Sequence, residues 1–408
     1  MQTYLVGGAV RDKLLNLPVK DKDWVIVGGN PEQLIALGYQ QVGADFPVFL
    51  HPNTKEEYAL ARTERKSGHG YTGFDVVFDD TVTLEDDLLR RDLTINAIAM
   101  DENGELIDPF QGQRDIADRK LRHVSDAFRE DPLRVLRIAR FSARFCHLGF
   151  TIADETEQLL REMVHSGELE HLVAERVWSE TSRALSSPSP SEYFRVLKRI
   201  GALTIIFPEL DALFGVPQPF RWHPEIDTGI HTLKALDIAR QLTDDVDVLM
   251  ATLCHDLGKG LTPEDILPSH HGHEGAGADL IKRVAKTYKW PVKTATLCEQ
   301  VARYHTHCHN IFALKASSVV KLLNNLNGFR QPERIAQFAI ACQADAQGRS
   351  GLERTPYPQA AFLARCLEQC QGVSAQAFVE QGLEGKAIGD AMHQQRVGLI
   401  KQLQKSAY

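Results

Sequence analysis

The stretch YLVGGAVRDKLLNLPVKDKDWVIV, residues 4–27, decides the fold. It begins as a short apolar strand, which runs into Gly7-Gly8 and then into a helix. A Gly-Gly turn before a helix lets backbone N–H groups approach phosphate oxygens, and the helix N-terminus favours their negative charge. The turn therefore predicts a phosphate seat, in which Gly8 leaves room for the phosphate and Arg11 contacts two of its oxygens.

Two carboxylates follow this seat in the chain. Asp21 and Asp23 stand at the start of a second predicted strand, Trp24–Val27. Residues two apart on a strand point to the same face, so both side chains are expected to project together. Carboxylates are the ligands that Mg²⁺ prefers, and a pair of them beside a phosphate seat predicts a two-metal site for phosphoryl transfer.

Four later segments belong to the same pattern: RRDLTINAIA (90–99), IDPFQGQRDI (107–116), EDPLRVLRIARF (130–141) and HDLGKG (255–260). With these motifs the chain resembles the DNA-polymerase-β-like nucleotidyltransferases. It is most similar to the bacterial tRNA nucleotidyltransferases that add CCA, the class II or poly(A) polymerase type with a C-terminal HD domain. The resemblance covers residues 4–349 and leaves the last ~60 residues without a usable motif.

The resemblance implies an α/β nucleotidyltransferase head followed by a mostly α-helical remainder that includes an HD domain. It implies template-independent addition of CCA to tRNA 3′ ends from CTP and ATP, and hence repair of tRNA ends. It also implies metal-dependent phosphatase, 2′-nucleotidase and 2′,3′-cyclic phosphodiesterase activity in the HD domain. Two alternatives stay open: a poly(A) polymerase, and a phosphohydrolase whose head senses nucleotides.

Composition places broad limits on the chain. With 408 residues it is too long for one ordinary core, and 25% charged with 43% apolar residues is typical of a globular protein. We find no 18-residue apolar run and no signal-peptide pattern, so no membrane partner is expected. Seven scattered cysteines without a CxxC pair favour a reducing compartment, and a cytoplasmic location is expected.

The net charge of −8 does not by itself suggest a nucleic-acid partner. A local patch at residues 129–144 carries five arginines against Glu130 and Asp131, a balance of +3. The expected partner is tRNA, and the expected oligomeric state is monomer or homodimer.

Strand and helix patterns alternate up to about residue 110, with helices expected near Pro31–Leu37 and Leu84–Met100. Helical periodicity dominates from about Arg114, interrupted by SSPSPSE (186–192) and GVPQPFRWHPEID (215–227). A glycine-rich loop is expected at 68–73. The predicted domains are a head at 1–140, a helical neck and body that positions RNA at 141–227, an HD phosphohydrolase at 228–329, and a helical C-terminal region at 330–408.

The resemblance assigns further residues of the nucleotidyl-transfer site. Glu57 is expected as a third carboxylate beside the aspartates that hold Mg²⁺. Arg91 is expected to contact the nucleotide, from a helix on which Asp92 and Asn96 share a face.

The resemblance also implies that a second helix, with EDPLR at its start, chooses the base. Asp131 would accept from the amino group of cytosine or adenine, while Arg134 would donate to the ring acceptors. Uracil and guanine would leave these groups unpaired, at roughly 1–3 kcal/mol per contact. Arg137 and Arg140 would then face the triphosphate or the ribose.

Nine of the sixteen histidines fall between residues 223 and 309. His231, the doublet His255-Asp256 and a distant carboxylate, for which Asp345 is the candidate, form the pattern of HD phosphohydrolases. His305 is the expected further ligand, whereas His307 and His309 are expected to line the surface. Imidazole and carboxylate ligands suit a borderline metal such as nickel, manganese, cobalt or zinc, with Ni²⁺ expected first. Such a metal would supply hydroxide to attack a phosphoester, and Lys259 could meet the phosphate.

Overall fold

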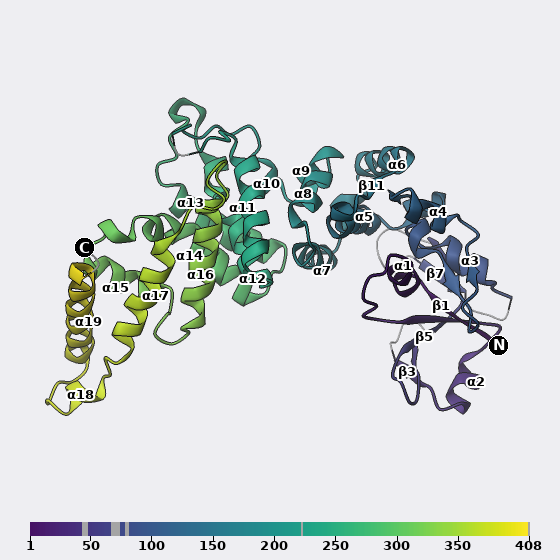
Figure 1. The fold of residues 1–408 in the computed structure, drawn as a ribbon, viewed down its shortest axis with the longest axis horizontal. Helices are drawn as coiled ribbons and strands as arrows, with labels where there is room; N and C mark the ends of the chain where they lie inside the picture. The colour runs from purple at the N-terminus through teal and green to yellow at the C-terminus, as the bar shows by residue number, and fades with distance from the viewer. Residues whose placement is uncertain (43–47, 67–73, 78–80, 222, 407–408) are drawn as a thin grey trace. The chain divides into compact units, whose positions relative to one another are not determined.

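The computed structural model describes residues 1–42, 48–66, 74–77, 81–221 and 223–406 (Figure 1). The chain forms two compact units. The first contains residues 1–173 and 199–202, and the second contains 174–198 and 203–408. The boundary between the units therefore falls inside the predicted neck, and the predicted HD and C-terminal segments share one unit. The glycine-rich loop at 68–73 lies outside the described residues.

A mixed sheet forms the middle of the first unit. Among the described residues it has seven strands in the order β3-β4-β5-β2-β1-β8-β9, and only β2 and β5 run parallel. These strands are β1 (Gln2–Val6), β2 (Asp23–Val27), β3 (Gln40–Val42), β4 (Val48–Leu50), β5 (Glu57–Leu60), β8 (Ala99–Met100) and β9 (Leu106–Ile107). Two short pairs lie outside this sheet: β6 (Thr63–Lys66) with β7 (Phe74–Val77), and β10 (Lys120–Leu121) with β11 (Thr151–Ile152).

The register of β1, β2 and β5 places the end of β1 next to the residues that begin β2 and β5. β1 pairs with β2 so that Val6 lies opposite Asp23, and β2 pairs with β5 so that Asp23 lies beside Glu57. The next pair, Trp24 and Tyr58, stacks with ring centroids 5.5 Å apart. Because strand faces alternate, the two carboxylates share the face opposite these rings. The turn after β1 therefore begins beside both carboxylates.

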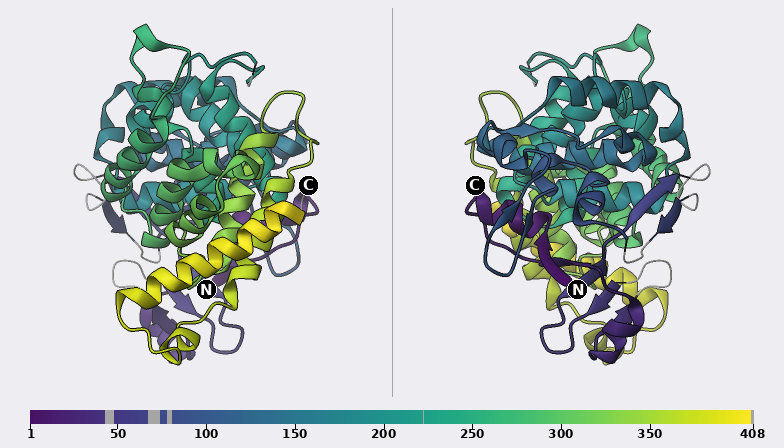
Figure 2. Two further views of the ribbon diagram at one scale, coloured as in Figure 1. Left: turned by 90° about the vertical axis from the view of Figure 1, so that its left-hand side faces the viewer. Right: turned by 90° about the vertical axis from the view of Figure 1, so that its right-hand side faces the viewer.

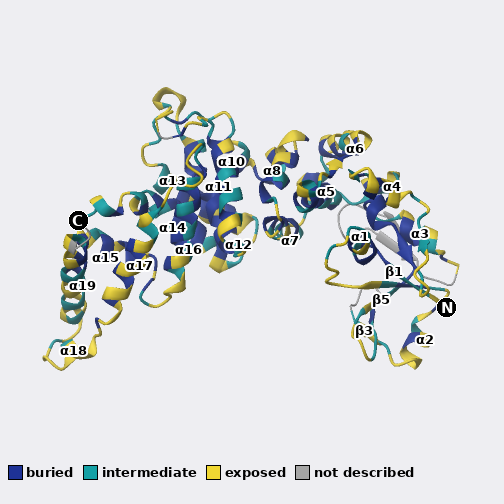
Figure 3. Cartoon of the chain, in the orientation of Figure 1, coloured by how far each residue is buried: buried dark blue, intermediate teal, exposed yellow. Residues whose placement is uncertain are grey.

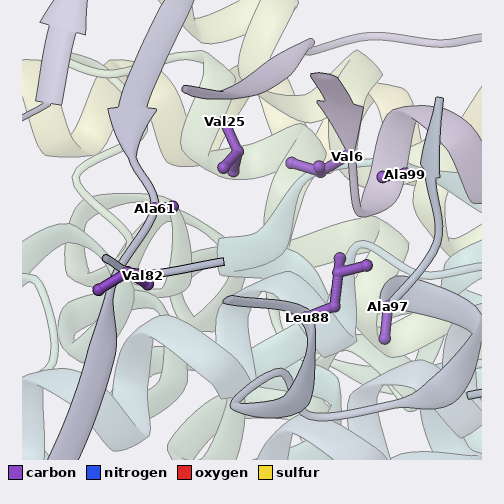
Figure 4. Packing of buried hydrophobic residues seen from close by; sticks show 7 residues of the cluster. All are labelled: Val6, Val25, Ala61, Val82, Leu88, Ala97 and Ala99. Atoms are coloured by element: carbon purple, nitrogen blue, oxygen red, sulfur yellow. The ribbon is translucent and has the colours of Figure 1, made fainter. Parts of the chain in front are cut away.

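Small apolar side chains fill the core behind this sheet. Figure 4 shows the cluster of seven, in which Val6 and Val25 come from neighbouring strands and Leu88 from a helix. The other members are Ala61, Val82, Ala97 and Ala99. This packing fixes the strands whose ends carry the site.

The helices of the first unit are short except for α5 and α6. They are α1 (Gly8–Leu14), α2 (Pro31–Ala36), α3 (Leu84–Leu89), α4 (Gly112–Ala117), α5 (Leu133–Phe145) and α6 (Asp154–His165). The predicted helix over Leu84–Met100 is wrong beyond Leu89. The chain instead makes a 3₁₀ turn at Thr94–Asn96 and then adds β8 to the edge of β1. Pairing with the sheet outweighs helical propensity here.

Among its described residues, the second unit contains helices and no strand, as predicted (Figure 1). Its helices are α7 (Ala174–Leu185), α8 (Pro190–Arg199), α9 (Leu203–Ile206), α10 (Pro208–Asp211), α11 (Thr228–Leu242), α12 (Val246–Cys254), α13 (His273–Thr287), α14 (Val292–His309), α15 (Ala316–Asn325), α16 (Glu333–Gln347), α17 (Pro358–Gln371), α18 (Gln376–Val379) and α19 (Lys386–Ser406). Helices α11, α12, α14 and α16 pack on one another, and Figure 3 shows their buried faces in dark blue. The long α19, yellow in Figure 2, packs on α15 and α17.

The two predicted interruptions have different structures. Residues 186–189 form a short connection between α7 and α8, within one unit rather than between two. The described residues of 215–227 form no helix, and Pro217 and Asp227 pair there in an isolated β-bridge. No described helix is long and apolar enough to cross a membrane.

Candidate functional site

The first candidate site lies where β1, β2 and β5 meet. Asp23 is the first residue of β2, whereas Asp21 precedes the strand, so the prediction that both lie at its start is correct only for Asp23. Asp21, Asp23 and Glu57 lie at the surface, although neighbouring groups partly shield the Asp23 carboxyl from solvent. Partial burial raises the pKa of Asp23, the charge of Asp21 adds to the rise, and Arg91 opposes it. Two like charges near one another suit a bound cation.

The three carboxylates do not close around one point in this structure. Within the described residues, the groups of at least three candidate ligands with atoms within 4.8 Å of one another all lie in the second unit. The strand register places Asp23 beside Glu57, and Asp21 lies two residues before Asp23. All three offer the carboxylate oxygens that Mg²⁺ prefers, but they do not converge on one point.

Gly7 and Arg91 lie together at the same edge. Gly7 has φ of +69°, a left-handed conformation in which glycine is favoured. A Cβ at Gly7 would lie 2.8 Å from Nη1 of Arg91, and Nη2 of Arg91 donates to Asp87 at 3.0 Å. Arg91 therefore lies against the Gly7 turn, and its positive charge opposes the rise in the pKa of Asp23. A residue that contacts the nucleotide would need such a position beside the turn and the carboxylates. At Gly8 a Cβ would lie 3.4 Å from Nη2 of Arg11.

Arg11 is an internal residue. Its side chain is 3% exposed, and its guanidinium donates to Asp12 at 2.7 and 2.9 Å and to Asn96 at 2.5 Å. The guanidinium also lies over the rings of Phe141 and Phe145. In this structure the Arg11 guanidinium, which was predicted to contact two phosphate oxygens, thus contacts side chains of its own unit.

Asp92 binds the arginine helix α5 to the head. Its carboxylate is 6% exposed and accepts two N–H groups of Arg137, at 2.6 and 2.8 Å. It also accepts from Asn96 at 2.8 Å and from the backbone N–H of Leu93 at 2.8 Å. Burial raises the pKa of Asp92, but Arg137 and Asn96 outweigh this effect and hold the pKa well below its usual range.

The residues predicted to select the base or to face the nucleotide lie just before α5 or on it. Asp131 precedes the helix and accepts the backbone N–H of Leu133 at 3.0 Å. Arg134 donates to the carbonyls of Ala127 at 3.1 Å and Arg90 at 2.6 Å. Arg140 is buried and lies over the ring of Phe141. Asp131, Arg134 and Arg140 thus come from one short segment, and each of them interacts with other groups of the protein.

The second candidate site joins four helices of the second unit. His231 comes from α11, His255 follows α12 directly, His305 lies on α14 and Asp345 on α16. His231 Nε2 lies 3.0 Å from Asp345 Oδ1, and His255 Nε2 lies 3.6 Å from the same oxygen. The structure thus brings the predicted ligands together, Asp345 and His305 among them.

Asp256 completes this cluster. Its Oδ2 lies 3.1 Å from Nε2 of His255 and 2.6 Å from the ammonium of Lys259, which also donates to Gln218 at 2.5 Å. Burial lowers the pKa of His255, but Asp256 and Asp345 outweigh it and raise that pKa to about 10. Burial lowers the pKa of His305 to about 3. Buried imidazoles and carboxylates at this density fit a divalent metal of the borderline class.

The sequence analysis misplaced His309 and missed Glu225, whereas His273 belongs to HHGHEGAG (270–277), a segment that the sequence offers as a source of possible ligands. His309 Nε2 lies 2.6 Å from Asp345 Oδ2, so its predicted surface role is wrong, whereas His307 is exposed as predicted. His309 lies one helical turn after His305, and that spacing could have revealed it. Glu225 lies 3.0 Å from Nδ1 of His231 and 3.0 Å from Nδ1 of His223, and no periodic pattern marks it. His273 lies 3.5 Å from Asp256 Oδ1.

An α/β head with carboxylates at a strand edge, followed by helices that carry a histidine–aspartate centre, defines a nucleotidyltransferase joined to an HD-type hydrolase domain. The Poly A polymerase head domain family matches residues 3–122, and the HD domain family matches residues 228–346. Between them, residues 149–214 match the family described as the probable RNA and SrmB-binding site of polymerase A.

Relatives that match nearly the whole chain identify the family. A multifunctional CCA protein of Hahella chejuensis is 56% identical over 99% of this chain and 96% of its own length. Those of Thioalkalivibrio sulfidiphilus and Teredinibacter turnerae are 56% and 57% identical, over 99% of this chain and 98% of their own lengths. The chain therefore belongs to the family of multifunctional CCA proteins, and the predicted family is confirmed.

Solved structures support the fold. A CCA-adding enzyme in complex with CTP is 22% identical, with a TM-score of 0.65 over 98% of this chain and 87% of that one. The Thermotoga maritima CCA-adding enzyme complexed with tRNA is 21% identical, with a TM-score of 0.62 over 100% of this chain and 92% of that one. The predicted fold class, an α/β head followed by helices with an HD domain, is confirmed.

Proposed function

We propose that this protein adds C, C and A to the 3′ end of tRNA, with CTP and ATP as substrates, and thereby repairs tRNA ends. The observation that carries the proposal is the match, at 56–57% identity, to multifunctional CCA proteins over 99% of the chain. The strand-edge carboxylates beside the Gly7 turn supply the chemistry that such a reaction needs.

Asp21 and Asp23, with Glu57 beside them, would hold Mg²⁺ at the end of β2. Mg²⁺ supplies a lower pKa for the attacking 3′-hydroxyl and a counter-charge for the leaving pyrophosphate. Arg91 would contact the triphosphate; its ion pair with Asp87 and its position against Gly7 support this role. Asp131 and Arg134, at the start of α5, would select the base.

A poly(A) polymerase has a head of the same family, and the triphosphates incorporated distinguish the two. The purified protein should add CMP and AMP to a tRNA lacking its CCA end, and should stop after three nucleotides. Asp21→Asn with Asp23→Asn should reduce the rate at least ~100-fold, a loss of more than about 2.7 kcal/mol of transition-state stabilisation. A long A tail, or near-normal addition by the double variant, would refute the assignment.

We propose that the HD centre is a metal-dependent phosphohydrolase with phosphatase, 2′-nucleotidase and 2′,3′-cyclic phosphodiesterase activity, and that Ni²⁺ supports it best. The support is the buried cluster of His231, His255, Asp256 and Asp345 beside Lys259. His255→Ala with Asp256→Ala should abolish hydrolysis of p-nitrophenyl phosphate and of 2′,3′-cyclic AMP. CCA addition by the same variant should continue, because the two sites share no residue. Loss of both activities in a folded variant would contradict two separate sites.

A further inference from the structure

Asp87 is a buried carboxylate on α3 that contacts both arginines of the 90–91 pair. Its Oδ1 accepts from Nε and Nη2 of Arg90, at 3.1 and 2.7 Å, whereas its Oδ2 accepts from Nη2 of Arg91 at 3.0 Å. Oδ1 also accepts the backbone N–H of Arg62 at 3.4 Å, two residues after the end of β5. One carboxylate therefore joins the two arginines to the segment that follows β5.

The carboxyl of Asp87 is ionised at neutral pH. Burial raises its pKa, but the charges of Arg91 and Arg90 outweigh burial and lower the pKa below its usual range. A buried charge of this kind is tolerated only where it is paired and hydrogen-bonded. Both arginines are therefore held on Asp87 in the folded protein, and the positions that their side chains can adopt are restricted.

The contact with Oδ2 occupies only part of the Arg91 guanidinium. Nη2 donates to Asp87, while Nε is buried without a hydrogen-bond partner within the described part of the chain. Nη1 lies against the Gly7 turn, 2.8 Å from the position that a Cβ would take there. Remaining donors on a charged group suit an anionic oxygen ligand, and the triphosphate is the anion that the proposed reaction brings to this turn.

The contact with Oδ1 acts on a different part of the site. It holds the side chain of Arg90, whose backbone carbonyl accepts from Nη2 of Arg134 at 2.6 Å. Nη1 of Arg134 donates to the carbonyl of Ala127 at 3.1 Å. Arg134 is the residue proposed to read the base. One of the two carbonyls that fix its position thus belongs to the residue that Asp87 anchors.

Helix α3 has other groups that hold it in place. Thr83 and Asp86 exchange hydrogen bonds at its N-terminus, at 3.0 and 3.2 Å. Leu88 is buried in the core cluster of Figure 4. A buried ion pair is often no more stabilising than apolar residues of similar volume, so stability alone gives little reason for Asp87 to be charged. A requirement for fixed arginine positions does explain the charge.

We propose that Asp87 is a positioning residue for nucleotide addition, which sets Arg91 for the triphosphate through Oδ2 and Arg134 for the base through Oδ1 and Arg90. This inference rests on the proposed addition of CCA, and it assigns both nucleotide affinity and base choice to one buried carboxylate. Arg91 and Arg134 would touch the nucleotide, whereas Asp87 acts only through them. A displacement of about 1 Å can reduce turnover ~100-fold, so small shifts of these arginines are sufficient.

Steady-state kinetics with a tRNA lacking CCA test both contacts. Asp87→Asn keeps the size of the side chain and removes its charge, so the KM for CTP should rise at least ~10-fold. The preference for CTP over UTP, as the ratio of the two kcat/KM values, should fall at least ~10-fold. Arg91→Ala should raise the KM similarly but leave the preference within ~2-fold of wild type. Asp86→Asn is the matched control on α3, because Asp86 bonds Thr83, and it should change neither quantity by more than ~2-fold.

Equal KM values and equal preferences in Asp87→Asn and Asp86→Asn would overturn the proposal. The double variant of Asp87→Asn and Arg91→Ala should have the KM of Arg91→Ala within ~2-fold, because a residue that acts through Arg91 adds nothing once Arg91 is removed. A further ~10-fold rise would show that Asp87 acts on affinity by another route, and would refute the contact through Oδ2.

A second variant decides if Asp87→Asn does not fold by circular dichroism. Arg90→Ala removes the partner of Oδ1, and it should lower the preference for CTP ~10-fold while the KM for CTP stays within ~2-fold of wild type. An unchanged preference would refute the path to Arg134. A wild-type protein that adds no CMP to this tRNA would refute the proposed function. Normal addition by wild type, with an unaltered Asp87→Asn, would refute this inference alone.

Discussion

Neutralising Asp92 should destabilise the first unit, because this buried carboxylate is where α5 is joined to the head. Asp92→Asn keeps the shape of the side chain but removes the charge that Arg137 meets at 2.6 Å. Removing one partner of a buried ion pair costs about 3–5 kcal/mol. The side chain of Arg137 is 34% exposed, so screening by solvent reduces this to about 2–3 kcal/mol.

The loss should appear in thermal unfolding of the full chain as a lower midpoint for the first unit, by about 5–10 °C. Asp118→Asn is the control, since Asp118 forms an exposed pair with Arg114 at 3.6 Å that is worth at most ~1 kcal/mol. A loss in Asp92→Asn below ~0.5 kcal/mol, equal to the control, would refute the role assigned to this carboxylate.

The pH dependence carries a definite sign. The pKa of Asp92 is lower in the folded protein than in the unfolded chain, where it is about 3.9. Its contribution is therefore complete above pH ~4 and is lost as the pH falls toward the folded pKa. The stability difference between wild type and Asp92→Asn should be constant from pH 7 to pH 5 and narrow below pH ~4. A difference that widens in acid would contradict the ion pair.

Three further results are expected. Gly7→Ala and Gly149→Ala should both lose about 1–2 kcal/mol on urea unfolding because both need positive φ, but only Gly7→Ala, whose Cβ meets Arg91, should slow nucleotide addition. Glu225→Ala should weaken Ni²⁺ binding to the HD centre by roughly 10–100-fold in calorimetry, with partial recovery in Glu225→Gln, which can still accept from Nδ1 of His231. Arg144→Ala should leave the salt dependence of tRNA binding, measured by filter binding, within ~0.3 of the wild-type slope, because Asp12 already pairs with it at 2.8 Å.

Local sequence was enough for the features that depend on short-range order. The strand, the Gly-Gly turn and the second strand in residues 4–27 follow from apolar alternation and glycine placement, and they determine where Asp23 lies. The histidine–aspartate doublet at 255–256 likewise stands out by type and spacing. In both cases the chemistry is carried by neighbours in the chain.

Features that depend on distant partners could not be derived in this way. The pairing of Asp92 with Arg137 joins residues 45 apart, and neither is unusual within its own segment. The helix predicted through residue 100 fails because β8 completes the sheet beside β1, a requirement that lies outside the segment. Glu225 lies in an irregular stretch where no period predicts which side chain turns inward.

The arginines at 129–144 show that the local charge counted along the sequence can differ from the local charge of the folded protein. The sequence gives this segment a balance of +3, which would favour an RNA-binding surface. In the fold, Arg137 meets Asp92, Arg144 meets Asp12 and Arg129 meets Glu162, so three of the five charges face carboxylates from elsewhere in the unit. A phosphate backbone is attracted by a local excess of positive charge. In the fold, the carboxylates that pair with these arginines remove that excess. Helix α5 is therefore better suited to fixing Asp131 and Arg134 in position than to attracting RNA. The proposed binding of tRNA by a chain of net charge −8 would then depend on shape and a limited number of contacts.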